Sequence, residues 1–75
     1  MKYIEDYVSE QLIDEIDAEL EKVYDNEEFA ICCLSSLDSD DEARLLLDFL
    51  KTNHLTKENR YKIIIFLLDM EKARN

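Results

Sequence analysis

The chain of 75 residues contains neither glycine nor proline. Tight hairpin turns and phosphate-binding loops usually need glycine, because only glycine reaches positive φ angles without steric cost. A sheet of short strands and a glycine-rich nucleotide-binding loop are therefore both disfavoured. Helices joined by short corners of Asn, Asp, Ser and Thr need neither residue. The composition predicts an all-α fold, and the length fits a single domain over residues 1–75.

Apolar periodicity and capping residues predict a small bundle of about four helices. We expect these helices at residues 2–24, 26–37, 40–52 and 57–73. The clearest helix start is Ser39, because Glu42 follows three residues later as in a capping box. The segment 29–34 is also compatible with a strand, but the sequence has no second alternating segment to pair with it. We expect the second and fourth helices to be central, because both are apolar on most sides.

The apolar pattern of the first helical segment changes its helical phase near Ser9. The apolar residues from Leu12 to Tyr24 form one stripe, whereas the apolar residues before Ser9 are rotated away from it. Serine is a favoured N-cap residue. One curved helix and two helices separated near Ser9 both fit this pattern.

The net charge of −10 is distributed unevenly along the chain. Residues 1–42 hold 15 acids and two bases, whereas residues 43–75 hold four acids and seven bases. An acidic chain repels nucleic acids and anionic lipids, so we expect no direct binding to nucleic acid or membrane. The longest apolar run, from Ile63 to Leu68, is too short to span a bilayer. The excess of acidic residues favours binding to another protein that has a basic surface.

Four acids of the first helix, Glu10, Asp14, Asp17 and Glu21, recur at helical spacing. This spacing places them on one face, away from the apolar stripe. Like charges so arranged destabilise a helix, and only Lys22 lies near enough to relieve them. One interpretation is an acidic ridge that docks into a basic groove of another protein. The simpler interpretation is a solvated helix face that keeps a small protein soluble.

Tyr3 and Tyr7 precede this ridge and belong to the apolar cluster that is out of phase. Tyrosine is favoured at protein interfaces because it combines an apolar ring with a polar hydroxyl. The cluster fits an exposed contact and equally fits an N-terminal turn packed on its own core. We include Tyr3 and Tyr7 with the four acids as candidate partner-binding residues.

The sequence offers no residue set for catalysis, for a metal or for a cofactor. Cys32 and Cys33 are adjacent and His54 is the only histidine, which is too few ligands for a zinc site and gives no nucleophile–base pair. We expect both cysteines to pack in the core as small apolar residues. We therefore expect that the protein is not an enzyme. Without a disulfide framework or an apolar leader segment, a cytoplasmic location is predicted.

These features favour a small, acidic, non-catalytic protein-binding module, such as an inhibitor, an immunity protein or a regulatory protein, that docks a basic partner surface. In size and charge the chain is similar to small acidic helical proteins of bacteria and phages, including immunity proteins and antitoxins, and no motif adds to this likeness. The alternative is a homo-oligomeric structural or assembly protein, with a homodimer as its simplest form. It would associate through the fourth helix, whose apolar surface three neighbours cover incompletely.

Overall fold

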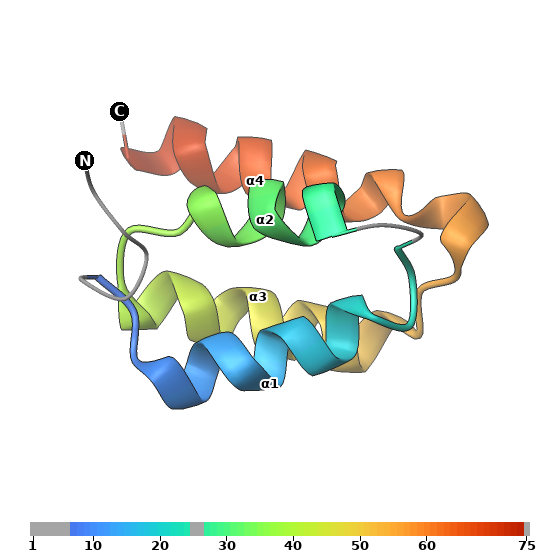
Figure 1. Cartoon of the computed structure of the whole chain (residues 1–75). Helices are drawn as coiled ribbons and strands as arrows, with labels where there is room; N and C mark the ends of the chain where they lie inside the picture. The colour runs from blue at the N-terminus through green and yellow to red at the C-terminus, as the bar shows by residue number, and fades with distance from the viewer. Residues whose placement is uncertain (1–6, 25–26, 75) are drawn as a thin grey trace.

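The protein is a bundle of helices arranged in two layers (Figure 1). The computed structural model describes residues 7–24 and 27–74. Within these ranges the α-helices are α1 (Glu10–Leu20), α2 (Glu27–Ser35), α3 (Asp40–Asn53) and α4 (Tyr61–Arg74). No strand occurs in the same ranges, and residues 29–34 lie in α2. The expected all-α fold is confirmed.

The most extensive helix–helix packing is between α1 and α3, which lie side by side in one layer (Figure 1). α2 and α4 form the second layer against them. The stacked rings of Phe49 and Phe66, with centroids 4.5 Å apart, join α3 to α4. One core cluster extends through both layers and contains these buried residues: Val8, Ile16, Leu20, Val23, Ala30, Cys33, Leu37, Ala43, Leu46, Leu47, Leu50, Ile63 and Leu67.

The expectation that the second and fourth helices are central is wrong. α2 buries only Ala30 and Cys33, and α4 buries only Ile63 and Leu67. Ile31 of α2 is 59% exposed, although it lies within an apolar run. The physical reason is that a helix in a two-layer bundle contacts its neighbours along one side. Additional apolar residues on the other sides therefore remain at the surface.

α1 begins immediately after Ser9, where the sequence changes phase. Ser9 occupies the N-cap position, but its side chain does not cap α1. Its hydroxyl and its backbone N–H each donate to the carboxylate of Asp40, at 2.7 Å in both cases. This pair ties the start of α1 to the start of α3. The expected helix over 2–24 is therefore wrong at residues 7–9 and 21–24, and its residues 2–6 lie outside the described part of the chain.

α3 begins at the predicted residue with one of the two hydrogen bonds of a capping box, since the Glu42 carboxylate accepts from the backbone N–H of Asp38 and not from that of Ser39. The hydroxyl of Ser39 accepts from the backbone N–H of Glu42 at 3.3 Å. The helix ends one residue later than expected, at Asn53, whose side-chain amide donates to the carbonyl oxygen of Phe49 at 2.8 Å. The residue after the helix, His54, takes the left-handed conformation, with φ of 47°.

The second and fourth helices also differ from their expected limits. α2 ends two residues earlier than expected, and residue 26 lies outside the described ranges. The expected fourth helix opens with a single turn of 3₁₀-helix, η2 (Lys57–Asn59), and α4 itself starts only at Tyr61. The side-chain oxygen of Asn59 accepts from the backbone N–H of Thr56 at 2.6 Å, and this hydrogen bond stabilises the tight turn.

Candidate functional site

A groove of about 300 Å³ lies between α1 and α2. We call it the acidic groove, because its charged lining residues are Asp14, Asp17, Glu21 and Glu27, and no lysine or arginine of the described chain lines it. Three of these acids belong to the predicted ridge on α1, and Glu27 comes from the first turn of α2. The tertiary structure thus brings acids of two helices to one place.

The floor of the acidic groove is apolar. Its side chains are Ile13 of α1, Tyr24 after α1, and Ala30, Ile31 and Leu34 of α2. Of these, Ile31 is exposed, and Ile13, Tyr24 and Leu34 are half-buried against the core cluster. A lysine or arginine side chain of a partner would fit this groove. Its charged end would pair with the carboxylates, and its aliphatic part would pack on the apolar floor.

Tyr24 is one of the residues of this groove that the candidate set from sequence omitted, together with Glu27 and the apolar residues Ile13, Ala30, Ile31 and Leu34. It follows the turn after α1 and its backbone N–H donates to the carbonyl oxygen of Leu20 at 3.1 Å. Burial raises the pKa of the Tyr24 phenol, and the negative charges of Asp17, Glu21 and Glu27 raise it further. The sequence placed Tyr24 on the apolar stripe of a helix to residue 24, whereas α1 ends at Leu20 and Tyr24 lies beyond the turn that follows.

The remaining candidates from sequence lie apart from the acidic groove or outside the described residues. Glu10 is exposed at the start of α1 and does not line the groove. Tyr7 is exposed in the turn before α1, at the opposite end of that helix from Tyr24. Tyr3 lies outside the described residues. Partner contacts by Tyr3, Tyr7 and Glu10 therefore stay predictions.

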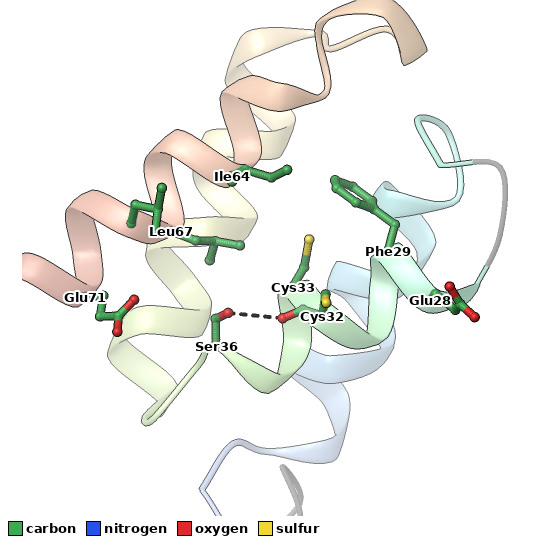
Figure 2. A pocket seen from close by; sticks show the side chains of 9 residues that line it. Glu28, Phe29, Cys32, Cys33, Ser36, Ile64, Leu67 and Glu71 are labelled. Carbon is green, nitrogen blue, oxygen red and sulfur yellow. Dashed lines mark hydrogen bonds between the residues drawn. The ribbon is translucent and has the colours of Figure 1, made fainter.

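A second groove, of about 450 Å³, lies on the other side of α2, between α2 and α4. Figure 2 shows Phe29 and Ile64 pointing toward each other across it, with Glu28 and Glu71 at its two ends. The guanidinium of Arg60 lies 5.6 Å above the centre of the Phe29 ring. Most of the lining is apolar, so we call it the apolar groove.

The two cysteines line this apolar groove and differ sharply in exposure. Cys33 is buried, as expected, and burial raises the pKa of its thiol to about 11, with a further contribution from Cys32. Cys32 is exposed, so the expectation that it packs in the core is wrong. Adjacent helical residues point about 100° apart, and α2 has only one buried side.

Across residues 7–24 and 27–74, no three His, Cys, Asp or Glu side chains are grouped so as to hold a metal ion. In the same part of the chain, no helix combines the length and the apolar character that crossing a membrane requires. No family model matches the sequence, and no curated protein and no solved structure is significantly similar to it.

Proposed function

We propose that this protein is a small non-catalytic binding module that docks a basic surface of a partner protein in the acidic groove. The observation that carries the proposal is the convergence of four carboxylates from two helices around an apolar floor. Mutually repelling carboxylates at one place cost folding stability. A cationic partner removes that cost on binding.

The partner surface that fits best carries two or three lysine or arginine side chains beside an apolar residue. The cations would pair with Asp14, Asp17 and Glu21, and the apolar residue would cover Ile31, which is already exposed. The net charge of −10 would accelerate the encounter by long-range attraction, so association would slow as salt is added. A protein that covers a basic surface in this way acts as an inhibitor, an immunity protein or a regulator. The exposed thiol of Cys32 suits a reducing cytoplasm.

Two variants with equal change in charge test the role of the acidic groove. The first combines Asp14→Asn with Glu21→Gln, which neutralises two exposed acids of the groove. The control combines Glu15→Gln with Asp48→Asn, which neutralises two exposed acids outside it. Each tagged protein is used to capture partners from lysate of the source organism, and captured proteins are quantified by mass spectrometry.

We expect a basic protein to be captured by the wild-type chain and by the control, and to be lost from the groove variant. With that protein purified, the association rate constant should fall about tenfold in the groove variant at low salt. Equal capture by both variants would contradict docking at the acidic groove. Capture of no basic protein by the wild-type chain would contradict the proposed function itself.

A further inference from the structure

α4 carries an apolar stripe outside the core cluster, and two of its residues, Ile64 and Leu68, also line the apolar groove. We define the α4 stripe as Tyr61, Ile64, Ile65 and Leu68, which are spaced as one helix face and are each about half exposed. The buried residues Ile63 and Leu67 lie on the side of α4 that packs into the core cluster. Four large apolar residues over two turns have the dimensions of a seam between two helices.

The charge along the chain makes α4 the surface most compatible with a second copy. Residues 57–74 hold five bases and three acids, whereas residues 1–42 hold most of the acids. Two copies that approach through their acidic halves would repel each other. Two copies that approach through α4 repel each other least, and at physiological salt the charges of the distant acids are largely screened.

The order of charges beside the α4 stripe favours an antiparallel arrangement. A third groove, of about 230 Å³, lies between α3 and α4 and includes Ile65 of the stripe in its lining. Lys62 and Asp69 are both exposed and both line this groove, so they flank the same edge of the stripe. They lie on either side of the midpoint of the stripe, which falls between Ile64 and Ile65. Antiparallel packing therefore places Lys62 of one copy near Asp69 of the other, twice per dimer. Antiparallel helix dipoles add to this preference, because the positive end of each helix then lies beside the negative end of the other.

We propose that two copies of this chain associate through the α4 stripe, with their α4 helices antiparallel about a two-fold axis near Ile64 and Ile65. Such an interface is self-complementary, so Tyr61 of one copy lies opposite Leu68 of the other. No described residue of α4 lines the acidic groove, so the dimer presents two acidic grooves. A partner with two basic sites then gains avidity. The dimer itself does not rest on the proposed function.

Sedimentation equilibrium of the purified full chain under reducing conditions tests the dimer. The stripe is short, so we expect a dissociation constant in the micromolar range. Ile65→Asp should weaken dimerisation about 100-fold, because the charge is buried at the centre of the interface in both copies. Leu45→Asp is the matched control, since Leu45 is 57% exposed on α3, outside the α4 stripe, and this change should leave the constant unaltered.

Charge reversal and cross-linking test the antiparallel arrangement. Lys62→Glu and Asp69→Lys should each weaken the dimer about fivefold, and the double variant should restore it. In a Cys32→Ser background, chains with Tyr61→Cys should form disulfides with chains carrying Leu68→Cys and not with themselves. Self-cross-linking of the Tyr61→Cys chain would overturn the antiparallel arrangement.

A monomer at every concentration up to the millimolar range, or an Ile65→Asp variant that dimerises as the wild type does, would overturn the dimer. Circular dichroism of each variant confirms that it is folded. Because purified protein is measured alone, a failure here leaves docking at the acidic groove untouched.

Discussion

Arg74, near the end of α4, forms a two-point ion pair with Glu42 in the first turn of α3. The two N–O distances are 2.6 and 2.5 Å. The same guanidinium donates to the carbonyl oxygen of Ser36 and lies 3.4 Å from the carboxylate of Asp38. Glu42 also accepts from the backbone N–H of Asp38 at 2.7 Å. One side chain thus connects the end of α4 to the α2–α3 corner and to the start of α3.

Removal of this guanidinium should destabilise the fold. Glu42 is only 15% exposed, so Arg74→Gln leaves a poorly hydrated carboxylate without its cation. We expect the free energy of unfolding to fall by about 1–2 kcal/mol, measured by urea denaturation. Arg44→Gln is the control, because its pair with Asp41 is 3.6 Å long and well exposed and should cost less than about 0.5 kcal/mol. Equal losses in the two variants would show that the Arg74 network has no special role.

The stabilisation by Glu42 should depend on pH. The hydrogen bonds from Arg74 hold the pKa of the Glu42 carboxyl below its usual value, with a further contribution from the backbone N–H of Asp38, although partial burial opposes the shift. A carboxyl whose pKa is lower in the folded state stabilises the fold above its unfolded pKa of about 4.3, and this contribution disappears as the pH falls through the folded value.

The stability difference between the wild type and Glu42→Gln should therefore be largest near neutral pH and shrink below about pH 4.3. Urea denaturation of both proteins at a series of pH values measures this difference, which also cancels the general effect of neutralising the other acids. A difference that stays constant from neutral to acidic pH would contradict the proposed pairing of Glu42.

The two thiols should react at very different rates. Cys32 is exposed, whereas Cys33 is buried and has a pKa of about 11, so little Cys33 thiolate exists at mildly alkaline pH. A chromogenic disulfide reagent should modify one thiol per folded chain rapidly and the second only on unfolding. Cys32→Ser should abolish the rapid phase, and Cys33→Ser should preserve it. Two equally rapid thiols would show that α2 does not bury Cys33.

Two adjacent leucines of α3 should differ in their contribution to stability. Leu46 is fully buried in the core cluster, whereas Leu45 is 57% exposed. Leu46→Ala should lower the free energy of unfolding by about 3 kcal/mol, because it removes buried contacts and leaves a cavity. Leu45→Ala should change it by less than about 0.5 kcal/mol. Thermal denaturation of both variants makes the comparison, and similar losses would contradict the orientation of α3.

Local chemistry made parts of this structure predictable. The absence of glycine and proline predicted the all-α fold. Ser39 with Glu42 predicted the start of α3, because a capping box acts within one turn and needs no distant residue. The change of phase of the apolar pattern at Ser9 also marked the start of α1, because this pattern is local too. The sequence alone nevertheless also allowed one continuous helix. The ridge acids Asp14, Asp17 and Glu21 share one face because helix geometry fixes the direction of each side chain.

Tertiary structure alone decided which apolar faces are covered and which groups meet across the chain. Periodicity gives the direction of an apolar stripe on its helix, but α2 and α4 are apolar on most sides and so have no preferred direction. The packing of the helices therefore determines that Ile63 and Leu67 are buried in the core and that Ile64 and Ile65 are exposed. The pairing of Arg74 with Glu42, 32 residues earlier, and the meeting of Glu27 with the acids of α1 depend in the same way on how the helices are arranged. Side-chain spacing within a single helix carries no information about that arrangement.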